Sequence, residues 1–149
     1  MNQRIIQKSI ALPASLDVIW EKWTTHQGLK TFFGVDNTIE LVPGGPFEIY
    51  FLMENPVGTR GGEGNRILSY LPKQMLSFTW NAPPSIPEVR NHIHKTWVVV
   101  QFVELKDQHT EVNLNHLGWL DGQAWDEAFA YFENAWDIVL NSLQESCKA

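Results

Sequence analysis

The sequence has a single cysteine, Cys147, among its 149 residues. One thiol cannot form an internal disulfide, which fits a reducing compartment, and we predict a cytoplasmic location. No apolar run approaches the roughly 18 residues of a membrane span. The N-terminus leads directly into a strand pattern, without the apolar segment of a signal peptide. The sequence therefore predicts neither a membrane span nor a secretion signal.

Basic residues are also few. Lysine and arginine number 11 against 17 aspartates and glutamates, which gives a formal net charge of −6. Nucleic acids and anionic membrane surfaces require clustered positive charge. The short run Arg60-Gly61-Gly62 is isolated and is followed by Glu63. We therefore expect neither kind of partner.

Sequence motifs for catalysis and metal binding are missing. No Gly-x-Ser-x-Gly, phosphate loop or His-Glu-x-x-His occurs, and the glycines between positions 58 and 64 lack a following Lys-Ser/Thr. His92 and His94 place two imidazoles on one side of a strand, but no third ligand has convincing spacing. We predict no metal site and no cofactor.

Aromatic residues are abundant, with seven tryptophans and eight phenylalanines. Because aromatic side chains carry large apolar areas, we expect a core or a pocket rich in flat rings. The hydrophobic content of 44% and the length suit one globular domain over residues 1–149.

The segment from Gly122 to Gln144 predicts a long amphipathic helix, with Asp121 as its candidate N-cap. Its apolar arc covers about half the circumference, wider than the usual ~100° stripe. Such a helix either lies in a concave partner or is a plain core helix. The centre of the arc is Trp125, Phe129, Phe132, Trp136, Val139, Leu140 and Leu143, and one flank is Ala124, Ala128, Tyr131, Ala135 and Ile138.

Alternating apolar residues predict the strands. One strand near residues 6–12 precedes two short helices, the first capped by Ser15 and the second ending at Gly34. Six consecutive strands follow over residues 38–42, 47–54, 64–71, 76–80, 95–105 and 112–116. Strands joined by short turns pair antiparallel. The predicted fold is α+β: a curved antiparallel sheet of about seven strands that grips the C-terminal helix.

Four segments together resemble a known family. They are Pro13-Ala14-Ser15 before Val18-Ile19-Trp20; Pro43-Gly44-Gly45-Pro46-Phe47; Leu76-Ser77-Phe78-Thr79-Trp80; and His116-Leu117-Gly118-Trp119 with Trp125, Tyr131-Phe132 and Trp136. In this order they resemble the domain named for the activator of heat-shock-protein-90 ATPase (AHSA), in the START-like, helix-grip (SRPBCC) superfamily. The resemblance implies a sheet wrapped on a C-terminal helix, with a cavity that takes hydrophobic small molecules in many relatives.

The same resemblance implies two other roles. Some relatives are cyclases or aromatases that act on polyketides. The eukaryotic co-chaperone has a further N-terminal domain that makes much of its chaperone contact, and we expect no room for such a domain in this chain. A chaperone partner is therefore a weaker expectation than a small molecule.

The position of His116 allows two interpretations. It shares strand parity with Val112 and Leu114, so its side chain is expected to point inward beside the start of the long helix. There it either orients a ligand and acts in acid–base chemistry, or is a core histidine bonded to backbone or to a tryptophan N–H. Glu63 and Asn65 share a parity toward the same space, although Glu63 is equally consistent with a solvated position.

We predict a binding protein for a hydrophobic or aromatic small molecule, lipid-like or polyketide-like, held between the sheet and the C-terminal helix. Residues 81–94 and 29–33 are expected to form the mouth. The alternatives are a cyclase-like enzyme that uses His116, and a protein-interaction module that is chaperone-linked or a homodimer through a sheet edge. The predicted cavity residues are Phe47, Ile49, Phe51, Glu63, Asn65, Phe78, Trp80, Phe102, Leu114, His116, Trp125, Phe129 and Phe132.

Overall fold

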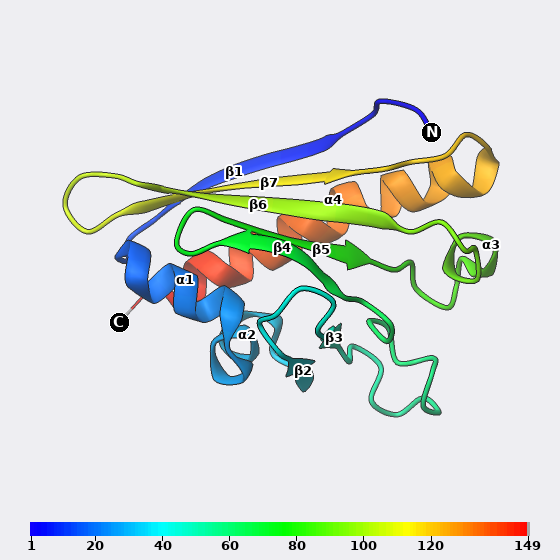
Figure 1. Cartoon of the computed structure of the whole chain (residues 1–149), viewed down its shortest axis with the longest axis horizontal. Helices are drawn as coiled ribbons and strands as arrows, with labels where there is room; N and C mark the ends of the chain where they lie inside the picture. Colours follow the sequence, from blue (N-terminus) through cyan, green and yellow to red (C-terminus); the bar gives the residue numbers. More distant parts are fainter. Residues whose placement is uncertain (149) are drawn as a thin grey trace.

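Five antiparallel strands form a twisted sheet that lies across a long C-terminal helix, α4 (Gln123–Ser146) (Figure 1). The computed structural model describes residues 1–148. The predicted α+β architecture is confirmed, but the seven strands divide into two sheets. The strand order in the large sheet is β1 (Ile6–Leu12), β7 (Thr110–Leu117), β6 (Thr96–Glu104), β5 (Met75–Trp80) and β4 (Ile67–Leu71).

A second sheet of two short strands extends the first. It pairs β2 (Asn37–Ile39) with β3 (Phe47–Ile49). Phe47 N–H donates to the carbonyl of Asn65 at 2.9 Å, and Ile67 N–H donates to Gly45 at 2.8 Å. These bonds place residues 45–47, at the start of β3, beside residues 65–67, at the start of β4.

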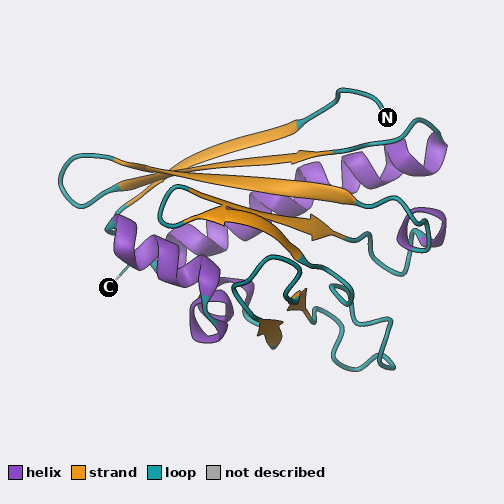
Figure 2. Cartoon of the chain, in the orientation of Figure 1, coloured by secondary structure: helices purple, strands orange, loops and turns teal. Residues whose placement is uncertain are grey.

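The predicted strand over residues 47–54 is wrong beyond Ile49. Phe51, Leu52 and Met53 lie in turns and are each more than 40% exposed. Leu52 N–H donates to Arg60 across the base of a loop instead of to a neighbouring strand. Alternation alone therefore predicted a strand over residues 51–54, for which residues 1–148 provide no partner strand. The chain between β3 and β4 forms a long loop beside the small sheet (Figure 2).

The two short helices are α1 (Leu16–Thr24) and α2 (His26–Phe33). Ser15 caps α1 by accepting from Val18 N–H, as predicted, and Gly34 ends α2 with a φ of 74°. Asp121 is not the cap of α4. Gly122 takes that position with a φ of 132°, which glycine adopts without steric cost. A further short helix, α3 (Pro87–Arg90), lies in the 81–94 connection.

Aromatic and aliphatic side chains fill most of the space between the sheet and α4. Leu114 on β7 and Phe78 on β5 are fully buried, and Phe78 stacks on Phe47 with ring centroids 4.1 Å apart. From α4, Trp136 and Leu140 complete this layer. Each such burial contributes roughly 1.5–3 kcal/mol to stability. The centre of the grip is therefore a packed core, and a cavity lies toward one flank of the helix.

Candidate ligand-binding site

A cavity of about 250 Å³ lies between the middle of α4, the end of β5 and two loops. The helix contributes one flank of its apolar arc, and β5 contributes its last residue. The remaining walls come from the loop after β3 and the loop after β5. The lining residues are Phe51, Leu52, Gly61, Gly62, Asn65, Trp80, Asn81, Pro83, Pro84, Tyr131, Phe132, Ala135, Trp136, Ile138 and Val139.

Two indole rings dominate the buried side of the cavity. Trp80 and Trp136 are 5% and 1% exposed, and their ring centroids are 5.1 Å apart. The outer side is formed by Phe51, Tyr131 and Ile138, which are 43–59% exposed. The cavity is thus floored by indole side chains and opens to solvent past an apolar rim. Flat aromatic surfaces of this kind favour stacking with a planar ligand.

The wall opposite α4 depends on close approach of a glycine segment to β3. A Cβ at Gly62 would lie 2.6 Å from both the amide nitrogen and the carbonyl oxygen of Ile49. Any larger residue there would push the loop outward. Gly62 N–H also donates to Ile49 at 2.8 Å, which fixes this wall to the small sheet.

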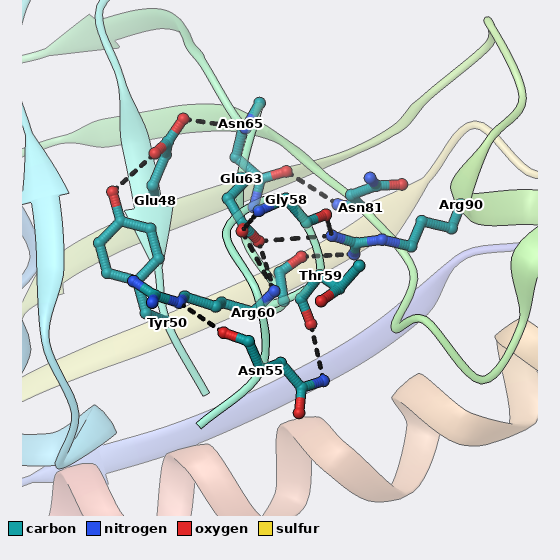
Figure 3. Close-up of polar contacts among 12 residues, drawn as sticks. Glu48, Tyr50, Asn55, Gly58, Thr59, Arg60, Glu63, Asn65, Asn81 and Arg90 are labelled. Carbon is teal, nitrogen blue, oxygen red and sulfur yellow. Dashed lines mark hydrogen bonds and ion pairs between the residues drawn. The ribbon is translucent and has the colours of Figure 1, made fainter. Parts of the chain in front are cut away.

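Arg90 of α3 holds the same loop from the other side. Its guanidinium donates to the carbonyls of Gly61 and Ala82, both at 2.7 Å, and to the carbonyl of Gly58 at 2.8 Å (Figure 3). Arg90 is 8% exposed, so these bonds are shielded from water. The planar guanidinium holds its N–H donors in fixed directions that match three backbone carbonyls, whereas a lysine ammonium group has no such fixed planar arrangement. The arginine therefore ties the 81–94 connection to the 58–61 loop.

Glu63 closes this loop on itself instead of facing the cavity. Its carboxylate accepts from the amides of Gly58 and Arg60, and it lies 3.4 Å from Arg90 Nη2 (Figure 3). Burial acts to raise the pKa of Glu63, but the backbone donors outweigh it and the net pKa is lowered. The charged form is thus the one that the loop stabilises.

Asn65 contributes the most buried polar side chain of the cavity wall, at 2% exposure. Its Oδ1 accepts from the backbone N–H of Asn81 at 2.9 Å (Figure 3). The Asn81 side chain is held in turn by Lys95, whose Nζ donates to Oδ1 at 3.2 Å. Burial, with Arg90 as a second cause, lowers the pKa of Lys95. These bonds fix two amide side chains at the inner edge of the cavity.

His116 is fully buried and does not line the cavity. Its Nδ1 accepts from Trp136 Nε1–H at 3.0 Å, and its Nε2 lies 2.8 Å from Thr96 Oγ1. Burial lowers the pKa of His116 to about 3, so the ring is neutral across the physiological range. The predicted inward orientation is correct, and the contacts are those of the core-histidine interpretation.

Comparison with known proteins shows the family. The model of the family described as Activator of Hsp90 ATPase homolog 1-like protein matches residues 13–148. This chain belongs to that family. Among curated proteins, no sequence matches the chain. Several solved structures share the fold of this chain.

Three solved structures illustrate how similar their folds are to that of this Activator of Hsp90 ATPase homolog 1-like chain. A Mesorhizobium loti protein has a TM-score of 0.75 at 15% identity, with 96% of each chain covered. The Aha1 dimer from Colwellia psychrerythraea has a TM-score of 0.72 at 21% sequence identity, and the match covers 97% of this chain and 96% of that chain. An HSP90 activator from Plasmodium falciparum has a TM-score of 0.70 at 16% sequence identity, and the match covers 93% of this chain and 92% of that chain. At these identities the likeness concerns the fold.

In this family member, four of the thirteen residues predicted for the cavity line it: Phe51, Asn65, Trp80 and Phe132. The others do not. Glu63 turns to the loop backbone, and Phe129 packs against Trp119 with ring centroids 5.1 Å apart. The remaining residues are buried in the core: Phe47, Ile49, Phe78, Phe102, Leu114, His116 and Trp125.

Several lining residues were not predicted. Tyr131, Ala135 and Ile138 lie on the flank of the helix arc, and its unusual width was the signal that could have identified them. Of the expected mouth, the 81–94 connection contributes Asn81, Pro83 and Pro84. The 29–33 segment does not line the cavity but supports it from behind, through rings such as Phe33 beside Phe51 (5.9 Å).

Two findings concern only residues 1–148. No helix within them is long and apolar enough to cross a membrane. In the same range, no three histidine, cysteine, aspartate or glutamate side chains gather as metal ligands would. His94 Nε2 lies 2.6 Å from the carbonyl of Gly118, which occupies the atom that a metal would need.

Proposed function

We propose that this chain binds a small, apolar, planar molecule in the cavity beside α4. The observation that carries the proposal is the cavity itself, with indole rings on its floor and an apolar rim at its mouth. Ligand sites are typically concave and mainly apolar, with a few placed polar groups. The buried side chains at the centre of the grip, such as Phe78 and Leu114, support a ligand position on this flank.

The dimensions of the cavity favour a compact ligand. Its volume of about 250 Å³ lies just below the ~300–1,000 Å³ that is common for drug-sized ligands. A compact space floored by two adjacent indole side chains suits a fused bicyclic ring better than a long acyl chain, which would need an extended tunnel. Among the predicted ligand types, an aromatic or polyketide-derived ring therefore agrees better with the site than a lipid chain.

Binding accounts for the site better than catalysis by His116. Both imidazole nitrogens are engaged within the core, and the ring has no surface toward the cavity. A general acid or base must reach the proton that it transfers, directly or through one water. The cyclase-like alternative would need a different residue.

The proposal is tested by filling the cavity. Ala135 lines it on α4, whereas Ala130 on the same helix is exposed and lies outside it. We expect Ala135→Phe to weaken binding of 2-isopropenylnaphthalene at least about tenfold, because the added ring occupies the ligand's space. Ala130→Phe is the matched control and should leave binding unchanged. If this probe does not quench the tryptophan fluorescence of the unmodified chain, the proposal is contradicted.

A second candidate role is self-association through an edge strand. Within residues 1–148, β1 pairs with β7 on one side and with no strand on the other. Open edges of this kind can accept another strand. The similar Colwellia psychrerythraea structure is described as a dimer. Light scattering after size exclusion tests this role, and a monomeric mass at high micromolar concentration would contradict it.

A further inference from the structure

A shallow groove continues the line of the cavity along α4. It lies between the C-terminal half of α4 and the end of α2, and the open space over it is about 620 Å³. Ile138 lines both the groove and the cavity, so the two spaces meet at this side chain. Because Ile138 is 59% exposed, it forms a low ridge between them and not a closed wall. The groove is lined by Thr31, Phe32, Ile138, Asn141, Ser142, Glu145 and Ser146.

One face of α4 carries both spaces. Tyr131, Ala135 and Ile138 line the cavity. Farther along the helix, Ser142 and Glu145 line the groove. Steps of four, three, four and three residues keep these side chains on one stripe of a helix with 3.6 residues per turn, and the stripe is about 21 Å long. A molecule that lies along this stripe occupies the cavity and the groove together.

The end of α2 connects the two spaces from the opposite side. Thr31 and Phe32 line the groove. The next residue, Phe33, packs against Phe51 of the cavity rim with ring centroids 5.9 Å apart. Helix α2 lies beside the C-terminal half of α4 (Figure 1). The groove and the cavity therefore share neighbours on both of the elements that border them.

The chemistry of the lining changes from the cavity to the groove. The cavity is lined mainly by aromatic, aliphatic, proline and glycine residues, whereas five of the seven groove residues are polar. The hydroxyls of Thr31 and Ser146 donate to backbone carbonyls, both at 2.6 Å. Asn141 is exposed and Ser142 is half-buried, and side chains of these two types both donate and accept hydrogen bonds. A polar group in the groove can therefore exchange bonds to water for bonds to these side chains.

Charges of opposite sign border the groove. Glu145 is the charged residue of its lining, and Lys148 pairs with it at 2.8 Å. On the α2 side, Lys22 Nζ donates to Thr31 Oγ1 at 3.1 Å. An anionic group in the groove would lie near a carboxylate, and a cationic group would lie near an ammonium. A neutral polar group meets like charge on neither side.

From these observations we infer that the ligand extends beyond the cavity: it is an aromatic ring system with a neutral, hydroxyl-rich extension such as a sugar. The ring lies on the indole floor of Trp80 and Trp136, and the extension passes Ile138 and lies in the groove. The step from Ala135 to Ser142 spans about 10 Å of helix, so a short extension is sufficient. This inference rests on the proposed function and specifies its ligand class.

Two probes that share one ring test the inference. The naphthyl oxygen carries a glucose in 2-naphthyl β-D-glucopyranoside and a methyl group in 2-methoxynaphthalene. Ser142→Phe fills the groove with a ring from α4. Ala130→Phe on the same helix is the matched control, because Ala130 is exposed and lies outside both spaces. Isothermal titration calorimetry gives the dissociation constant of each probe for each chain.

We expect Ser142→Phe to weaken binding of the glucoside on the order of tenfold and to leave binding of the methyl ether unchanged, because only the glucoside reaches the groove. Ala130→Phe should leave both unchanged. Hydration of the free probes cancels, since each probe is compared with itself across the chains. Equal weakening of both probes by Ser142→Phe, or of neither, would overturn the inference while leaving the proposed function intact.

Spectra of the natural chain give an independent readout, which replaces the variants if they do not fold. In a ¹H–¹⁵N spectrum, the glucoside should shift the backbone amide signals of Thr31, Asn141 and Ser142, and the methyl ether should leave them in place. If the glucoside shifts only the indole signals of Trp80 and Trp136, the inference is overturned. Binding of the methyl ether alone would also overturn it, with the proposed function intact. If neither probe binds, both fail.

Discussion

Trp136 Nε1 donates a hydrogen bond of 3.0 Å to His116 Nδ1, and this bond joins the cavity floor to the centre of the core. Because an indole N–H only donates, the neutral imidazole carries its proton on Nε2. That proton is directed to Thr96 Oγ1 at 2.8 Å, and Thr96 donates to the carbonyl of Trp80 at 3.0 Å. One neutral chain of hydrogen bonds thus connects both tryptophans of the floor.

The first prediction concerns the stability contributed by this chain of bonds. His116→Phe keeps a planar ring but removes both acceptor and donor, leaving Trp136 N–H without a partner. We expect the free energy of unfolding to fall by about 2–4 kcal/mol. Urea unfolding followed by circular dichroism measures it. His109→Phe, at an exposed position, is the control, and equal stability of the two variants would contradict a structural role for His116.

The second prediction is the pH dependence that follows from the same residue. Burial lowers the pKa of His116 to about 3, below the ~6.5 of an unfolded chain. Between these values the unfolded chain binds the proton and the folded chain does not, so stability falls as pH decreases. The loss from this one group between pH 7 and pH 4.5 is about 2.5 kcal/mol. His116 contributes its full stabilisation only at pH values above the pKa of the unfolded chain.

The measurement compares the natural chain with His116→Phe. Unfolding free energies at pH 7 and pH 4.5 give the acid-induced loss for each. The natural chain should lose about 2.5 kcal/mol more than the variant, because only it has the buried imidazole. Other ionisable groups contribute equally to both chains and cancel. An identical loss in both would show that the imidazole is not buried in its neutral form.

The third prediction concerns the wall held by Arg90. Arg90→Met keeps the apolar stem but leaves the carbonyls of Gly58, Gly61 and Ala82 without their donor. We expect amide exchange in residues 56–63 to accelerate at least about tenfold, which corresponds to loss of more than ~1.4 kcal/mol locally. Mass spectrometry of exchanged peptides measures this rate.

Arg66→Met is the matched control for that experiment. Arg66 is exposed, and its ion pair with Glu48 spans 3.4 Å at the surface. Such pairs contribute little, so exchange in the loop should stay near that of the natural chain. Equal acceleration in both variants would mean that the loop is held by general charge effects and not by the buried guanidinium.

Much of the architecture was predictable because it depends on local periodicity. The spacing of three and four along residues 122–144 predicted α4, and strand parity predicted the inward side chain of His116. The predicted strand over 47–54 failed because Phe51 and Leu52 alternate without a partner strand. Periodicity indicates which secondary structure a segment favours, whereas the pairing of strands depends on segments distant in the sequence.

The cavity residues were harder to predict for a related reason. Which rings fill the space between sheet and helix depends on their packing, and Phe47 stacked on Phe78 leaves no room in the centre. Asn65 and Glu63 were placed together by parity, yet the glycine loop turns Glu63 toward backbone amides. The family resemblance indicated a cavity, and only the coordinates located it on the flank of α4.

The central claim is that an apolar ring enters the cavity beside α4, and tryptophan indole N–H signals test it most directly. In a ¹H–¹⁵N spectrum titrated with 2-isopropenylnaphthalene, the account predicts that the signals of Trp80 and Trp136 shift with saturation. Those of Trp23 and Trp125, which do not line the cavity, should stay in place. Unchanged signals for Trp80 and Trp136 at saturating probe, or equal shifts for all four, would contradict it.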